Sequence, residues 1–295
     1  MNPVVRGIVA YPVTPFRPGD TEVVDVAVLH LLIDRMIEAG VDAVAPLGSA
    51  GEGVYLDRGE WDAVARESVE YVAGRVPTVV GVSDLTTAGA VHRARIAEDV
   101  GATAVMALPM SYWRLTETEL RRHFTAIADA ISIPVMVYNN PATTGIDMSP
   151  EFLADLVGTV DGITMVKESS GDITRMHRLR DLGGGELPFF NGRNPLALQA
   201  FAAGAVGWCT VAPCLIPRQI VEFRRLVDAG ESAAAAAVFR RIRPVLDAIV
   251  GRGLPTTVKS GLRSIGIDAG EPRPPMLPLE DAAAGELRRR IVAAL

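Results

Sequence analysis

The sequence reads PVMVYNNPATTGIDMSPEFLADLVGTVDGITMVK from residue 134 to residue 167, and this stretch decides the fold. Its two apolar runs, residues 134–138 and 163–167, have the composition of parallel strands that are covered on both faces. Between them, Ser149-Pro150 places a proline in the first turn of a helix. The stretch therefore predicts a strand, a helix and a second strand, which is the repeating unit of a parallel sheet.

The same alternation extends from the N-terminus to about residue 229. The eight predicted strands are residues 7–10, 43–47, 77–82, 104–108, 134–138, 163–167, 187–191 and 206–210. Segments of helical period follow them and begin near Val26, Asp57, Thr86, Thr116, Ser149, Ile173, Leu196 and Pro217. Eight such units favour an α/β fold of the (β/α)8 TIM barrel type over an open doubly wound sheet. We assign this catalytic barrel to residues 1–229.

The remaining residues, 230–295, change in character and predict a helical C-terminal region rather than a ninth unit. Residues 232–249 are rich in alanine but keep an apolar face that includes Phe239, Ile242 and Leu246. Residues 255–265 and 280–294 predict two further helices, with a proline-rich segment between them. We therefore expect a helical extension that follows the barrel.

Composition limits the class of partner and the compartment. The chain of 295 residues has a net charge of -6 and no basic stripe, so we expect neither nucleic acid nor membrane as a partner. Cys209 and Cys214 lack the paired spacing of a zinc site and are typical of reduced cysteines in a cytoplasmic protein. The four histidines lie inside predicted helices, and we expect no metal site.

Lysine is rare in this chain, because only Lys167 and Lys259 occur among its 29 cationic residues. Lys167 ends the predicted strand 163–167, and the active site of a TIM barrel lies at this end of its strands. A lysine amine in dry surroundings, unlike a guanidinium, can lose its proton and attack a carbonyl. Tyr138 ends the neighbouring strand and offers the proton transfers that imine chemistry needs. The alternatives are a lysine that extends from a strand end to solvent and a tyrosine of the core.

A glycine-rich loop, Gly48-Ser49-Ala50-Gly51-Glu52-Gly53, follows the predicted strand 43–47. Successive backbone N–H groups in such a loop can bind a carboxylate or a phosphate. The alternative is that its glycines serve only the geometry of the turn. Both interpretations place the loop at the same mouth of the barrel as Lys167 and Tyr138.

Several motifs, in order along almost the whole chain, give it a resemblance to a known family. They are GIVAYPVTPF (7–16), LGSAGEGVYL (47–56), YNNPATTG (138–145), VKESSGD (166–172), NGRNPLALQAFAAGAVGW (191–208) and RPPMLPL (273–279). The chain resembles the dihydrodipicolinate synthase and N-acetylneuraminate lyase family, whose members are Schiff-base-forming aldolases. The resemblance implies an imine between Lys167 and a 2-keto acid, with Tyr138 as proton relay and the carboxylate held at Gly48, Ser49 and Ala50. It also implies a homotetramer built as a dimer of dimers, and an enzyme without metal or organic cofactor.

Three positions depart from the family's pattern. Thr143 stands where dihydrodipicolinate synthases usually carry an arginine for the acceptor's carboxylate, unless Arg193 or Arg114 supplies that charge. Ala50 replaces the second of two hydroxyl residues, and Ser111 stands where a relay tyrosine is usual, with Tyr112 next to it. We expect either that Tyr112 turns inward or that Ser49, Ser111 and Tyr138 form the relay.

The remaining candidate residues for substrate binding follow the last two predicted strands. Gly192, Arg193 and Asn194 lack the acidic side chains with which sialic acid lyases bind a polyol, and they suggest an acceptor with an anionic or carbonyl oxygen. Cys209 and Thr210 are expected near the keto acid, although Cys209 is best explained by packing. Lys259 is expected to be structural, at the entrance to a helix.

The motifs therefore predict a Schiff-base-forming lyase, an aldolase or a dehydratase, that acts on pyruvate or a 2-keto-3-deoxy acid. One alternative is a true 4-hydroxy-tetrahydrodipicolinate synthase with a displaced acceptor arginine. The other is a keto-acid-binding protein that has lost turnover through the changes at Ala50 and Ser111.

Overall fold

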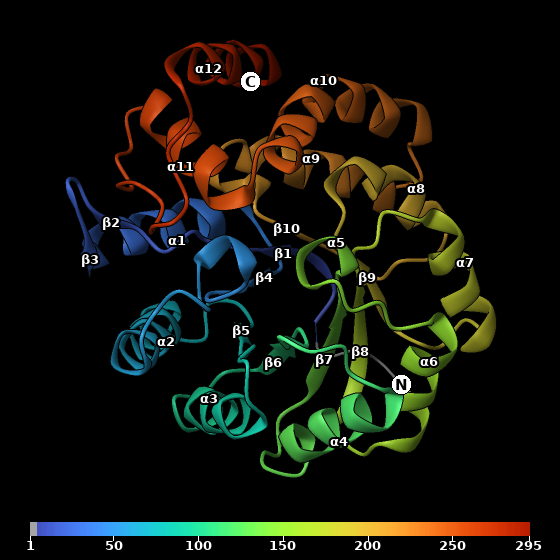
Figure 1. Ribbon diagram of the computed structural model, residues 1–295. Coiled ribbons are helices and arrows are strands. Elements are labelled where there is room, and N and C mark those ends of the chain that lie inside the picture. Colours follow the sequence, from blue (N-terminus) through green and yellow to red (C-terminus); the bar gives the residue numbers. More distant parts are fainter. Residues whose placement is uncertain (1–4) are drawn as a thin grey trace.

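The computed structural model describes residues 5–295 and has a closed barrel at its centre (Figure 1). Eight parallel strands pair in the order β4-β1-β10-β9-β8-β7-β6-β5. A parallel bridge between Val44 and Thr78 joins the two ends of this order. The strands are β1 (Gly7–Ala10), β4 (Ala43–Val44), β5 (Val79–Gly81), β6 (Ala104–Ala107), β7 (Val135–Asn139), β8 (Ile163–Glu168), β9 (Phe189–Asn191) and β10 (Gly207–Thr210). The predicted TIM barrel is confirmed; residues 1–4 of its assigned segment lie outside the described residues.

Helices surround the barrel where their apolar stripes meet the outer faces of the strands (Figure 1). They are α1 (Val26–Ala39), α2 (Arg58–Val72), α3 (Thr87–Asp99), α4 (Glu117–Ala128), α6 (Pro150–Thr159), α7 (Ile173–Leu182), α8 (Ala197–Ala202) and α9 (Pro217–Asp228). The expected helix start at Thr116 is a capping box in which Thr116 and Glu119 satisfy each other's backbone N–H groups. Local signals of this kind made the helices predictable.

Three local features differ from the predictions. Strand β4 ends at Val44, earlier than predicted, because Pro46 has no N–H and Leu47 adopts a φ of 61°. A small antiparallel hairpin of β2 (Phe16–Arg17) and β3 (Asp20–Val24) follows β1, and a one-turn helix, α5 (Pro141–Thr144), follows β7. All three lie in or next to the loops at the mouth of the barrel, where short segments carry weak periodicity.

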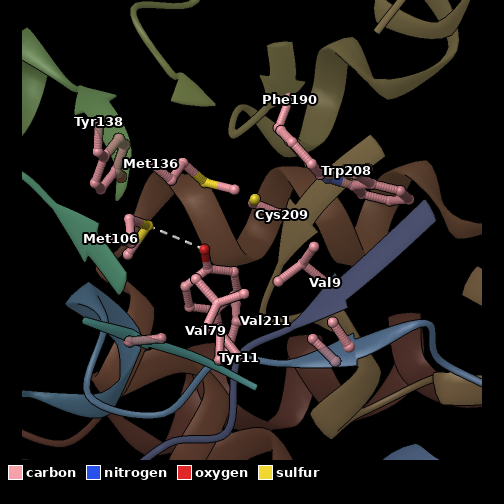
Figure 2. Packing of buried hydrophobic residues seen from close by; sticks show 14 of the residues in the cluster. Val9, Tyr11, Val79, Met106, Met136, Tyr138, Phe190, Trp208, Cys209 and Val211 are labelled. Atoms are coloured by element: carbon pink, nitrogen blue, oxygen red, sulfur yellow. Dashed lines mark hydrogen bonds between the residues drawn. The ribbon is translucent and has the colours of Figure 1, made fainter. Parts of the chain in front are cut away.

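The centre of the barrel is packed with sulfur and aromatic side chains (Figure 2). The hydroxyl of Tyr11 donates a hydrogen bond to Sδ of Met106 at 3.1 Å, and Met136 and Cys209 lie beside this pair (Figure 2). All four residues are buried. This cluster fills part of the barrel interior.

The C-terminal region folds as α10 (Ser232–Gly251), α11 (Leu254–Ser264) and α12 (Asp281–Ala294), as predicted. These helices pack on one another on one side of the barrel (Figure 1), and α11 also contacts the short 3-10 helix η1 (Ser49–Gly51) that follows β4. The predicted boundary at residue 229 falls between α9 and α10. Across residues 5–295, none of the helices has the length and apolarity needed to cross a membrane.

Candidate active site

Lys167 lies near the C-terminal end of β8, directly opposite Tyr138 of β7 in the strand register. Its side chain is only 5 % exposed and points into the mouth of the barrel. The amine lies 3.8 Å from the ring centre of Tyr138 and 4.2 Å from that of Tyr11, and its Nζ is 3.6 Å from Sδ of Met106. Among residues 5–295 no carboxylate pairs with this amine. Its neighbours are two aromatic faces and a thioether.

The neighbouring residue, Glu168, fixes the direction in which Lys167 points. Successive side chains of a strand alternate between its two faces, so Glu168 points away from the barrel interior. Its buried carboxylate accepts hydrogen bonds from Asn139 at 3.1 Å and Ser170 at 2.6 Å, and it pairs with Arg175 at 3.2 Å. This network fixes the end of β8 with Glu168 on its outer face. The side chain of Lys167, one residue earlier, therefore points into the barrel interior.

The two phenols beside Lys167 have different partners. The Tyr138 hydroxyl accepts a hydrogen bond from Nδ2 of Asn140 at 2.8 Å. The Tyr11 hydroxyl has the thioether of Met106, a weak acceptor, as its partner. Burial raises the pKa of Tyr11 well above its ordinary value, and Cys209 adds to the shift, so Tyr11 stays protonated.

The two cysteines are free, as predicted, and both are buried. Burial raises the pKa of the Cys209 thiol, although the nearby Lys167 opposes the shift. Burial also raises the pKa of Cys214 to about 12. Both thiols are therefore protonated at neutral pH, which makes them poor nucleophiles and supports the packing interpretation of Cys209.

The glycine loop approaches the site as a tight turn. Its 3-10 helix η1 leaves the backbone N–H groups of Ser49 and Ala50 without a hydrogen bond inside the described chain, whereas Gly51 and Glu52 donate to Gly48 and Ser49. A side chain at Gly48 would clash with the ring of Tyr11, since its Cβ would lie 2.7 Å from that ring. Glycine therefore serves close packing here, and Ser49 and Ala50, whose N–H groups have no partner in the described chain, line the cavity at the mouth of the barrel.

A buried ion pair holds this loop from behind. Glu52 ends η1 with a φ of 54°, and its carboxylate lies 2.7 Å from Nζ of Lys259. The same carboxylate accepts the backbone N–H of Arg273 at 2.7 Å. The side chains of Lys259 and Glu52 are 1 % and 0 % exposed. This buried ion pair agrees with the structural role expected for Lys259. The residue lies inside α11 (Leu254–Ser264) and not at the entrance to the helix.

Above Lys167 the mouth of the barrel holds a cavity of about 490 Å³. Most predicted site residues line it: Gly48, Ser49, Ala50, Tyr138, Thr143, Lys167, Gly192, Arg193, Asn194, Cys209 and Thr210. Asn194 and Thr210 are already engaged, since Asn194 accepts from Trp208 and Thr210 accepts from the backbone of Ala212. The guanidinium of Arg193 has no ion-pair partner within residues 5–295.

Two predicted residues are not brought to the cavity. Ser111 accepts a hydrogen bond from the backbone of Trp113, and Tyr112 is 90 % exposed with its ring edge-on to Trp113. Leu108 and Met110, before them in the same loop, line the cavity, and Arg114 is not among the lining residues. The inward turn expected of Tyr112 is therefore not seen in the single chain, because the loop directs its aromatic side chains outward.

The structure also adds three site residues that the sequence interpretation missed: Tyr11, Met106 and Ser169. The hydroxyl of Ser169 is buried without a hydrogen-bond partner within residues 5–295. A Cβ on residue 192 would lie 1.7 Å from this hydroxyl and 2.9 Å from Cε of Lys167, so Gly192 makes room for both side chains. Strand alternation offered the signal for Ser169, since it follows Lys167 by two residues and shares its face.

No group of three or more histidine, cysteine, aspartate or glutamate side chains in residues 5–295 is arranged to hold a metal ion.

The sequence pattern that defines the Dihydrodipicolinate synthetase family matches residues 4–294. The chain belongs to this family. The family is one of lyases, and its membership makes this protein an enzyme of that class.

Solved and curated relatives agree with this assignment. The chain is 33% identical to a 4-hydroxy-tetrahydrodipicolinate synthase from Pelobacter propionicus over 285 residues, which cover 96% of each chain. A structure from Pseudomonas aeruginosa, of a candidate dihydrodipicolinate synthetase, superposes with a TM-score of 0.96 at 50% identity and covers 99% of this chain and 100% of its own. Dihydrodipicolinate synthase from Thermotoga maritima has a TM-score of 0.94 at 26% identity and covers 99% of both chains.

Proposed function

We propose that this family member is a Schiff-base-forming lyase whose nucleophile is Lys167. The observation that carries the proposal is the contrast between the two lysines. Lys259 is buried and paired with Glu52, whereas Lys167 is buried beside phenols and a thioether without a carboxylate partner in the described chain. An amine that no carboxylate engages is available to attack a carbonyl.

The proposed reaction begins when Nζ of Lys167 adds to the C2 carbonyl of a 2-keto acid and the carbonyl oxygen takes up a proton. Loss of that oxygen as water leaves an iminium, which accepts the electron pair released when the C3–C4 bond breaks or when C3 loses a proton. The imine itself is thus the electron sink, and we propose no further cofactor. The product keto acid is freed when water hydrolyses the imine.

Tyr138 is the proton carrier that we propose for these steps. Its ring contacts the amine, and its hydroxyl accepts a hydrogen bond from Asn140, which orients the phenol beside the lysine. The free N–H groups of Ser49 and Ala50 provide donors for the keto acid's carboxylate. The protonated Tyr11 and the unpaired Ser169 hydroxyl add two neutral hydrogen-bonding groups beside the lysine.

A second candidate function is 4-hydroxy-tetrahydrodipicolinate synthase, the activity that the curated relatives carry in their names. Arg193 supports it, because this guanidinium lines the cavity and offers a cation for the acceptor's carboxylate that Thr143 lacks. Assays decide between the two. Condensation of pyruvate with aspartate semialdehyde would establish the synthase, whereas release of pyruvate or water from 2-keto-3-deoxy acids would establish the broader lyase.

A single assay also separates an enzyme from a protein that only binds keto acids. Enamine formation exchanges the C3 protons of pyruvate with deuterium from the solvent, and NMR follows this exchange without any acceptor. Exchange that depends on Lys167 supports the lyase. An imine without exchange, and without turnover of any acceptor, would support binding alone.

We further propose that the enzyme is a cytoplasmic homotetramer, a dimer of dimers. The two free cysteines agree with a reducing compartment. Three exposed apolar side chains, Leu85, Tyr112 and Trp113, lie on loops after β5 and β6, with exposed fractions of 68 %, 90 % and 77 %. Exposed aromatic side chains on neighbouring loops are typical of a protein interface.

A further inference from the structure

The cavity above Lys167 has two chemically different sides. Polar lining residues follow the consecutive strands β7, β8, β9 and β10: Asn140, Thr143, Ser169, Arg193, Asn194 and Thr210. On the opposite arc, the loops after β4 and β6 contribute Val54, Leu108 and Met110. The C-terminal region covers the cavity and contributes Leu254, Pro255 and Met276. We call these last six residues the apolar side.

Few polar side chains lie near the apolar side, and they are Ser83 and Tyr55. Ser83, which follows β5, is a polar lining residue in this arc, and its hydroxyl accepts the backbone N–H of Leu108 at 2.9 Å. Its carbonyl oxygen accepts a hydrogen bond from Arg93. One acceptor position of this hydroxyl is thus taken by the protein, and its O–H and the phenol of Tyr55 are the side-chain polar groups that remain beside the apolar side.

The charged side chains of the cavity also lie on its polar side. Among the described residues that line the cavity, only Lys167 and Arg193 are charged, and none is acidic. Binding a polyhydroxylated chain takes several polar partners, since each hydroxyl buried without one loses its hydrogen bonds to water. The apolar side cannot provide them.

The cavity is also much larger than pyruvate requires. Its volume of about 490 Å³ is that of a site for a drug-sized molecule, for which roughly 300–1,000 Å³ is typical. A three-carbon keto acid held at Lys167 and the η1 loop leaves the apolar side in contact with the remainder of a longer substrate. The part of the substrate beyond the keto acid therefore packs against hydrocarbon side chains.

We infer that the substrate is a 2-keto acid whose chain beyond the imine carbon ends in a hydrocarbon group, aliphatic or aromatic, that packs against the apolar side. This inference rests on the proposed function, because it takes Lys167 as the imine-forming residue. The polar side, with Arg193 and Ser169, faces the oxygen substituent of the same chain. In the aldolase direction the acceptor is therefore an apolar aldehyde.

The test compares two six-carbon 2-keto acids, 2-oxohexanoate and the polyhydroxylated 2-keto-3-deoxygluconate. The concentration of each that half-saturates borohydride-trapped adduct on Lys167 is measured by peptide mass spectrometry. We expect 2-oxohexanoate to bind at least about 10-fold more tightly, since a single methylene in an apolar pocket is worth roughly 10- to 200-fold. Equal binding, or tighter binding of the sugar acid, would overturn the inference.

Two variants of one residue sharpen the result. Met110→Gln places an amide of similar shape on the apolar side, and Met110→Leu keeps the side chain apolar. The ratio of the two half-saturating concentrations should fall in the glutamine variant and persist in the leucine variant; no difference between them would count against the apolar side. Failure of any keto acid, pyruvate included, to form an adduct would instead reject the proposed function itself.

Discussion

At the scale of single residues, the two lysines of this chain differ in the groups that surround their amines. Both are buried at the mouth of the same barrel or just behind it, yet one faces Glu52 at 2.7 Å and the other faces the rings of Tyr11 and Tyr138. Burial lowers the pKa of Lys259, and its ion pair with Glu52 opposes that shift. The paired lysine stabilises a loop, and the lysine without a carboxylate is the one we assign to chemistry.

Replacing Tyr138 by phenylalanine tests the proton relay. The variant keeps the ring against Lys167 but loses the hydroxyl that Asn140 holds. We expect deuterium exchange into pyruvate to slow by about 10²- to 10⁴-fold, the usual contribution of a positioned general acid or base. Tyr71→Phe, which removes a phenol on α2 outside the cavity, serves as the control. Exchange at the wild-type rate in Tyr138→Phe would exclude this phenol as the carrier.

His123 predicts a pH effect on stability. Burial lowers the pKa of this histidine in the folded state, while the unfolded chain keeps its ordinary value of about 6.5. The unfolded state therefore binds more protons just below that pH, and the folded protein loses stability as the pH falls through about 6.5. Urea unfolding of the wild type and His123→Gln should converge or cross between pH 7.5 and 5.5. Parallel pH profiles for the two proteins would contradict this account.

At the scale of elements, the loop that we propose for the carboxylate is held by a contact from α11. Removing one partner of a buried pair leaves the other charge uncompensated, which typically costs about 3–5 kcal/mol. We expect Glu52→Gln and Lys259→Met each to lower the free energy of unfolding by this order. The double variant should lose less than the sum of the two, and urea denaturation measures all three. Strict additivity would show that the pair does not act as a unit.

The strands and helices were predictable because their signals are local. Each strand is a short apolar run, and helices such as α4 carry their own capping residues. The place of Lys259 was not predictable in this way, because its partner Glu52 lies far away in the sequence and meets it only when α11 packs on η1. The hairpin β2–β3 and helix α5 are too short to show a period.

The candidate site was predictable in part for the same reason. Lys167 and Tyr138 could be placed together because each lies near the end of a strand in a barrel of known geometry. Tyr11 and Ser169 were missed, although each follows or extends a strand on its inward face. The outward direction of Tyr112 depends on the path of a loop, and no pattern in the sequence fixes that path.

At the scale of the whole molecule, the exposed loops after β5 and β6 predict association. Trp113→Lys should shift the assembly toward a smaller species, because it places a charge in the apolar interface that we propose at these loops. Analytical ultracentrifugation gives the mass, and Val292→Lys, on the exposed face of α12, is the matched control. A wild-type protein that sediments as a monomer would refute the proposed tetramer.

The central claim is that Lys167 forms an imine with a 2-keto acid, and the scarcity of lysine makes its test direct. The protein is incubated with pyruvate, reduced with borohydride and digested, and the masses of the Lys167 and Lys259 peptides are compared. We predict one reduced pyruvyl adduct on the Lys167 peptide, none on the Lys259 peptide and none in Lys167→Arg. An unmodified Lys167 peptide with pyruvate and with longer 2-keto acids, or an adduct that persists in Lys167→Arg, would contradict the account.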